Sequence, residues 1–279
     1  MIDQKEQDLF YKYAVIPPLK QFSIKDNNEA NKYHRIVVDS AFRDIILFPS
    51  PAKYDFILDS EIADVISISL INADIPLSMY LINQYFNTFI LNGQNITIPN
   101  GDYSITTLMS AIQLILPSGI NIGYNIDQST IYFTNSSSFS FNPGNLDKLL
   151  GFLPQTYTAA YSGTLNKWII TAPYKYNLNY NNCIIMYITG CDPLRSSITQ
   201  YDRAFAVITN ENNKLNINSI EENIKYFSPP IGRLLKFSVK FLDRYGNMYD
   251  FQNMDHRFEL MITNFKLSRK YANVTSMGS

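Results

Sequence analysis

The feature that most constrains the fold is a stretch that alternates with a period of two residues, ADVISISLINADIP at residues 63–76. A period of two places successive side chains on opposite faces of a β-strand. One face is mostly apolar and carries Ile66, Ile68, Leu70 and Asn72. The opposite face is less apolar, because it contains two serines, and carries Val65, Ser67, Ser69 and Ile71. This pattern is typical of a sheet that is packed on one side, and Pro76 removes a ladder donor and ends the strand.

Further alternating runs lie on either side of the chain's centre. The run YDFIL places Tyr54, Phe56 and Leu58 on one face. Near the C-terminus, RLLKFSVKFLD places Leu235, Phe237, Val239 and Phe241 opposite Lys236, Ser238 and Lys240. The run HRFELMI then places Phe258, Leu260 and Ile262 on one face. Strands of this kind, joined by turn residues, predict an all-β sandwich.

Residues 98–156 have a different character. Leu108, Ile112 and Ile115 follow the period of a helix, with Ser104 or Thr106 as its N-cap and Pro117 just after its end. The run NLDKLLGF predicts a short helix that Gly151 closes. Just upstream, Asn92-Gly93 between two apolar runs predicts a hairpin. A helix and hairpins between purely β segments predict a small α+β insertion.

Composition limits the functions open to the chain. Only 17% of the 279 residues are charged, against roughly 25% in ordinary soluble domains. The formal net charge of −1 argues against a nucleic-acid-binding domain, which is usually strongly basic. The 20 tyrosines and 18 phenylalanines on a charge-poor chain are typical of contacts between protein subunits, although they also fit a genome rich in A and T. The N-terminus shows no signal peptide and no run is long enough to span a membrane, so we expect a soluble protein made inside the cell.

Candidate chemical groups are few. The sequence contains no nucleophile-elbow, zinc-protease or P-loop motif. Two cysteines, Cys183 and Cys191, could be bridged, but nothing in the pattern supports a bridge. Together with the distant His34 and His256 they do not form a metal-ligand set. We therefore predict no enzyme and no catalytic, cofactor-binding or metal residue.

Several charged residues nevertheless need an interpretation. Asp55 with Asp59, or Asp250 with Asp255, resembles a glycosidase acid and base, but on strands and turns such pairs are more often solvated or cap turns. We expect His256 to be a turn residue whose ring bonds Asp255 or the backbone. We expect Arg43 to pair with Asp39 or Asp44 and so to fix the entry strand. The single tryptophan, Trp168, is expected to be a core or interface anchor.

An ordered series of motifs resembles a known group of viral proteins. The series is D-x-x-x-R-D at residues 39–44, PSP at 49–51, YDFIL, DVISISL, IPLSMY, IPNGDY at 98–103, LLGF at 149–152, and the run from Arg233 to Ile262. It is similar to the jelly-roll penton and minor capsid proteins of nucleocytoplasmic large DNA viruses and of virophages. The resemblance implies a jelly roll with an inserted module, homopentamers at the five-fold vertices, and contact with a major capsid protein.

We therefore expect one all-β, jelly-roll sandwich built from residues 33–97 and 157–267. Residues 98–156 are the expected α+β insertion, residues 1–32 a flexible N-terminal arm and residues 268–279 a flexible tail. The expected function is a penton protein of the virion, made in the host cytoplasm. A minor capsid protein that cements the major capsomers is one alternative. A carbohydrate-binding module and a fibre or baseplate component of a phage are others.

Overall fold

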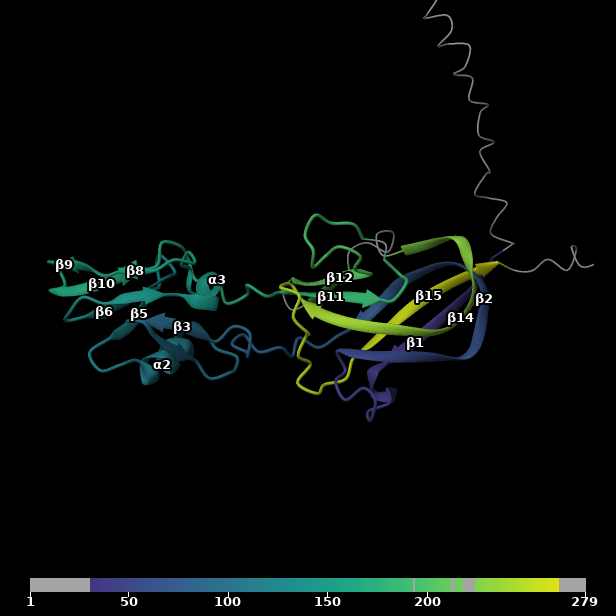
Figure 1. Cartoon of the computed structure of the whole chain (residues 1–279), viewed down its shortest axis with the longest axis horizontal. Coiled ribbons are helices and arrows are strands. Elements are labelled where there is room, and N and C mark those ends of the chain that lie inside the picture. Colours follow the sequence, from purple (N-terminus) through teal and green to yellow (C-terminus); the bar gives the residue numbers. More distant parts are fainter. Residues whose placement is uncertain (1–30, 193, 212–213, 218–223, 266–279) are drawn as a thin grey trace, which may run out of the picture.

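The computed structural model describes residues 31–192, 194–211, 214–217 and 224–265, which form two lobes arranged end to end (Figure 1). The predicted C-terminal tail lies outside these residues. The predicted N-terminal arm also lies outside them, except that Asn31 and Lys32 begin the first strand.

The larger lobe is a β-sandwich. Its strands are β1 (Asn31–Asp39), β2 (Lys53–Asp74), β11 (Cys183–Ile188), β12 (Ala206–Glu211), β13 (Lys214–Ile217), β14 (Ile224–Asp243) and β15 (Arg257–Phe265). They are hydrogen-bonded in the order β1-β15-β2-β14-β11-β12-β13. Every neighbouring pair is antiparallel.

Two long strands, β2 and β14, each extend from one layer into the other, so the hydrogen-bonded ladder is continuous between the layers (Figure 1). Residues 65–74 of β2 pair with β15, whereas residues 53–63 pair with the second part of β14. The break falls at Asp64, whose φ of 52° marks a local bend. One layer therefore contains β1, β15, the second half of β2 and the first part of β14. The other contains the first half of β2, the second part of β14, β11, β12 and β13. Two antiparallel layers, one of four and one of five strands, connected in this way form the predicted jelly roll.

The core of the sandwich confirms most of the predicted inward faces. Ile68 and Leu70 are fully buried, as are the predicted side chains of β15, Phe258, Leu260 and Ile262. Val65, predicted on the opposite face with the serines, is also fully buried and Ile66 is only partly buried, so the predicted faces are wrong at this end of the run. Along β14, Phe237, Val239 and Phe241 are buried as well. Leu235 is the exception, being 47% exposed. A register shift between Leu234 and Lys236 turns Leu234 inward in its place, so the predicted position of Leu235 is wrong.

The smaller lobe has its own core and contains helices as well as strands. Its strands are β3 (Thr88–Leu91), β4 (Gln94–Thr97), β5 (Asn121–Asn125), β6 (Thr130–Asn135), β7 (Ser140–Asn142), β8 (Tyr157–Thr158), β9 (Ala160–Ser162) and β10 (Lys167–Thr171). Its helical segments are α2 (Ile105–Ile115), η3 (Gly144–Leu146) and α3 (Asp147–Leu150). The strands form two four-stranded sheets, β5-β6-β10-β9 and β4-β3-β7-β8.

The boundaries of this core differ from the predicted insertion of residues 98–156. The core begins at Ile82 and ends at Tyr180. The reason is strand pairing: β3 pairs with β4 and β7, and β10 pairs with β6 and β9, so neither joins the sandwich. The hydroxyl of Tyr180 donates to the carbonyl of Leu81 at 3.2 Å, which brings the two ends of the lobe together.

Three local predictions in the smaller lobe are confirmed. Helix α2 begins after Ser104, whose side chain accepts from the backbone N–H of Thr107. Asn92 and Gly93 have φ values of 49° and 80° and form the tight turn between β3 and β4. Gly151, with φ 78°, closes α3.

Candidate functional site

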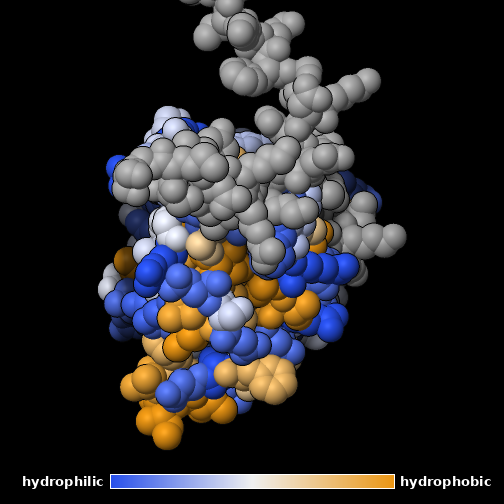
Figure 2. All heavy atoms as spheres, turned by 90° about the vertical axis from the view of Figure 1, so that its right-hand side faces the viewer, coloured by the Kyte–Doolittle hydropathy of each residue, from blue (hydrophilic) through white to orange (hydrophobic). Residues whose placement is uncertain are grey.

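The most unusual surface of the sandwich is the loop between β1 and β2. A short 3-10 helix, η2 (Ser40–Phe42), opens it, and four large apolar side chains then face solvent. They are Phe42, 88% exposed, Ile45, 61%, Ile46, 93%, and Leu47, 70%. We call these four residues the apolar tip. Hydrophobic atoms gather along the lower edge of the end-on view (Figure 2), the side on which this loop projects in Figure 1.

A buried arginine holds the loop in shape. The side chain of Arg43 is only 4% exposed. Its guanidinium donates to the carbonyls of Ser40 (2.8 Å), Phe48 (3.1 Å) and Pro49 (3.2 Å), and to Oδ1 of Asp255 (2.7 Å). Three carbonyls from both ends of the loop thus converge on one planar donor group. The loop is therefore organised before any partner binds.

The predicted ion pairs of Arg43 with Asp39 or Asp44 are wrong, because both carboxylates have other roles. Asp39 accepts from the backbone N–H of Ala41 as the N-cap of η2. Asp44 accepts from the N–H groups of Ile46 and Leu47 at 3.0 and 3.1 Å. The carboxylate that pairs with Arg43 is instead that of Asp255, which lies just before β15.

His256 is a buried core residue, so the predicted turn role is wrong. Its ring is stacked on Phe251, with centroids 4.5 Å apart, and its Nε2 lies 3.1 Å from the hydroxyl of Tyr54. Burial lowers the pKa of His256 to about 4. Its Nδ1 has no hydrogen-bond partner among the described residues. A neutral ring packed among aromatic side chains contributes to the core and is not placed as a solvent-facing general base.

Three of the four carboxylates considered as a glycosidase site, those of Asp55, Asp250 and Asp255, are bound to structural partners. Asp55 accepts from Ser238 and pairs with Lys236, and these hydrogen bonds lower its pKa. Asp250 accepts from the backbone and side chain of Gln252. Asp59 is exposed and lines a groove described below.

The cysteines are free and buried, so the structure contains no bridge between Cys183 and Cys191. Burial raises the pKa of the Cys191 thiol to about 12 and also raises that of Cys183. Trp168 is partly buried against the smaller core, edge-to-face with Tyr161 at 5.7 Å. In the part of the chain that the structure describes, no group of three or more acidic, histidine or cysteine side chains is placed to hold a metal ion.

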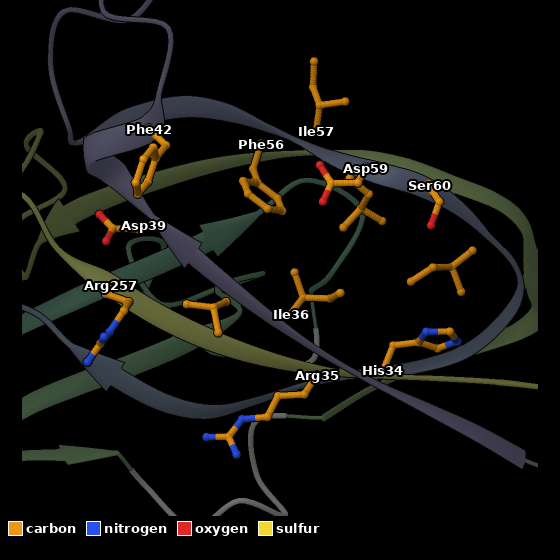
Figure 3. A pocket seen from close by; sticks show the side chains of 13 residues that line it. His34, Arg35, Ile36, Asp39, Phe42, Phe56, Ile57, Asp59, Ser60 and Arg257 are labelled. Atoms are coloured by element: carbon orange, nitrogen blue, oxygen red, sulfur yellow. The ribbon is translucent and has the colours of Figure 1, made fainter.

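A groove runs beside the apolar tip. It is lined by residues 34–37 and Asp39 of β1, Phe42, residues 56–60 and Ile62 of β2, and Arg257 (Figure 3). Its volume is about 570 Å³. Sequence reasoning missed both the tip and the groove. The signal for the tip was the apolar run IILF at residues 45–48 inside a segment that otherwise contains turn residues.

Comparison with known proteins places the chain in a family without assigning it a role. A crystal structure of the mavirus penton protein matches 85% of this chain and 99% of its own length, with 11% sequence identity and a TM-score of 0.41. At that level of similarity the match supports no inference about function. No curated protein matches the chain. Among the described residues, no helix is long and apolar enough to cross a membrane. A family model matches residues 21–229, more than half of the chain, and the chain therefore belongs to that family, described as a family of unknown function (DUF5901).

Proposed function

We propose that this protein is a structural subunit of an icosahedral viral capsid, located in the virion, and that it forms the five-fold vertices. The observation that carries the proposal is the apolar tip, a rigid loop with four large apolar side chains in solvent. A fold alone does not imply a function, so the argument rests on this surface and not on the jelly roll.

The tip has the size and composition of a protein-binding surface. Four large side chains at these exposures offer on the order of 500 Å² of apolar area. The largest apolar patch on a typical monomer is about 300–600 Å² and is often functional. One side of a standard protein interface buries about 800 Å², so the tip can form the centre of an interface but needs polar surroundings to complete it.

The rest of the chain supports assembly from copies of itself. The net charge of −1 on 279 residues gives little Coulomb repulsion when copies are packed together. A ring closes by head-to-tail contacts, in which the tip of one copy meets a different surface of the next. The order of the sequence motifs, which resembles penton and minor capsid proteins, supports the same role. In this role the chain also contacts a major capsid protein and is synthesised in the host cytoplasm.

The test compares two single substitutions of exposed aliphatic residues. Ile46→Asp places a charge in the apolar tip, and Leu114→Asp, at a position that is 87% exposed on α2 of the smaller lobe, is the matched control. Light scattering over a range of concentrations should show the unsubstituted chain and Leu114→Asp associating into a closed oligomer. Ile46→Asp should stay monomeric with an unchanged melting temperature.

Location within the shell is tested separately. Labelled chain reconstituted with a major capsid protein should appear at the five-fold positions alone. Density between capsomers would replace the vertex role with that of a minor capsid protein. If Ile46→Asp associates as well as the unsubstituted chain, the tip is not the assembly surface and the proposal loses its main support.

A further inference from the structure

One side of the sandwich is open between its two layers. Among the described residues, β1 pairs with β15 alone and forms the edge of its layer. Residues 53–63 of β2, at the edge of the other layer, pair with β14 alone. The groove of about 570 Å³ lies between these two free edges (Figure 3). Every second N–H and C=O of β1 therefore points away from β15 without a partner strand.

Core side chains are incompletely covered at this opening. Ile36 from β1 and Phe56 from β2 point into the space between the strands (Figure 3) and pack against the sandwich core, yet both are only partly buried. Their neighbours farther along the same faces, Val38 and Tyr54, are each 1% exposed. The opening thus combines an unpaired backbone edge with apolar side chains that lack a cover, which are the two features that strand addition uses.

The faces of β1 define what an added strand must present. His34, Ile36 and Val38 face inward, whereas Tyr33 and Val37 are 54% and 50% exposed on the outer face. In an antiparallel pair, residues directly opposite each other share a face. An added strand therefore needs apolar residues at alternate positions toward the groove and polar residues between them.

We propose that residues 21–25 of the same chain fold back onto β1 as an antiparallel edge strand that covers this groove. Their sequence, QFSIK, places Phe22 and Ile24 on one face and three polar residues on the other. Residues 26–30, DNNEA, supply a connection of the length and composition of a hairpin loop. With this five-residue connection residue 25 lies opposite Asn31, so Phe22 lies opposite His34 and diagonal to Ile36, and Ile24 lies opposite Lys32.

The connection also favours the chain's own segment over that of a second copy. A five-residue loop makes the pairing intramolecular, with an effective concentration in the millimolar range or above. The match to the family model begins at residue 21, so the region shared within the family includes residues 21–25. Covering β1 would also protect an exposed strand edge from pairing with other chains. The inference does not depend on the proposed capsid role.

Disulfide trapping in the full-length chain tests whether residues 21–25 pair with β1 and which of their side chains face the groove. His34→Cys is combined with Phe22→Cys, the residue directly opposite it, and the matched control combines His34→Cys with Ser23→Cys, whose side chain belongs to the outer face. The native cysteines are buried and should not compete. Under mild oxidation we expect an intramolecular bond with position 22, and at least about tenfold less with position 23.

The other outcomes overturn the proposal. A covalent dimer would show that the segment of a second copy fills the groove. Equal trapping at positions 22 and 23, or no trapping in a folded protein, would show that residues 21–25 do not form this strand.

Hydrogen exchange provides an independent measurement that does not require new cysteines. In the unsubstituted chain, the amides of β1 that point toward the groove should exchange at least about tenfold more slowly than in Phe22→Asp/Ile24→Asp. The control Gln21→Asp/Ser23→Asp adds the same charge on the outer face and should keep the protection. Equal exchange in both double variants would refute the strand even if the cysteine variants fail to fold.

Discussion

Replacing Arg43 by methionine should both destabilise the sandwich and release the apolar tip. Methionine keeps much of the aliphatic volume of the side chain but none of its donors. The substitution leaves the carbonyls of Ser40, Phe48 and Pro49 and the carboxylate of Asp255 without their shared partner.

The size of the effect follows from these four bonds. A net contribution of about 1 kcal/mol each gives an upper value of ~4 kcal/mol. Water can reach Asp255, whose side chain is 46% exposed, so part of the loss is recovered. We therefore expect a loss of about 2–4 kcal/mol in the free energy of unfolding, which is a fall of roughly 5–12 °C in melting temperature for a chain of this size. Arg43→Lys keeps the pairing with Asp255 but loses the planar fork, and should lose about half as much.

Thermal and urea unfolding of the full-length chain measure these losses. The matched control is Arg233→Met, because the side chain of Arg233 is 82% exposed and lies 3.5 Å from Glu61. A pair of this kind contributes about 0–1 kcal/mol. If Arg43→Met melts within 1–2 °C of both the control and the unsubstituted chain, then water replaces all four bonds and the loop is not held by Arg43.

Three further predictions concern the rest of the chain. The neutral form of His256 is favoured in the folded state, so the free energy of unfolding should fall by roughly 3 kcal/mol as pH drops from about 6.5 to about 4. Urea titrations over this pH range should find a smaller dependence of the free energy of unfolding on pH in His256→Gln. Gly151→Ala should lower the melting temperature clearly more than Gly93→Ala. Both glycines have positive φ, but only at Gly151 would an added Cβ collide with backbone, the carbonyl oxygen of Tyr174. Replacing residues 82–180 by a short Gly/Ser linker should leave a sandwich with a cooperative melt, since the ends of the lobe meet at Leu81 and Tyr180; loss of folding would show that the smaller lobe is not a separate module.

The sandwich could be predicted because its strands follow the period of two almost throughout. The alternation around Ile68 and Leu70 and that of β15 identified buried faces correctly. Prediction failed where the period was interrupted. A bulge at Leu235 shifts the pattern by one residue, and such a shift exchanges inward and outward faces. The continuity of β2 across Asp64 also depends on pairing with distant strands, which local pattern does not encode.

The boundary of the smaller lobe could not be predicted for a related reason. The hairpin of β3 and β4 has an unambiguous turn, but its local sequence does not say whether it joins the sandwich or pairs with β7. The same limit applies to Arg43. Its sequence neighbours Asp39 and Asp44 were the obvious partners, whereas Asp255 lies 212 residues away and is brought there only by the fold.

The base of the loop is tied to the aromatic core through a short hydrogen-bonded path. Ser40, which is fully buried, donates to Asp255 and accepts from the backbone N–H of His256 at 2.9 Å. His256 in turn packs on Phe251 and bonds Tyr54. Because this path runs from the base of the loop to the core, we expect the base to keep its shape as long as the sandwich is folded, whereas the tip also needs Arg43.

The tip and the groove meet at Phe42, which is 88% exposed and also lines the groove. A strand that covers the groove would therefore lie beside the tip and could contribute to the surface that a neighbouring subunit meets. Substituting Phe42 would disturb both features and could not separate them. Ile46 belongs to the tip alone and residues 22 and 24 to the proposed strand alone. If Phe22→Asp/Ile24→Asp weakens association as much as Ile46→Asp does, strand and tip form one composite interface; if association is unchanged, the strand serves the stability of the single subunit.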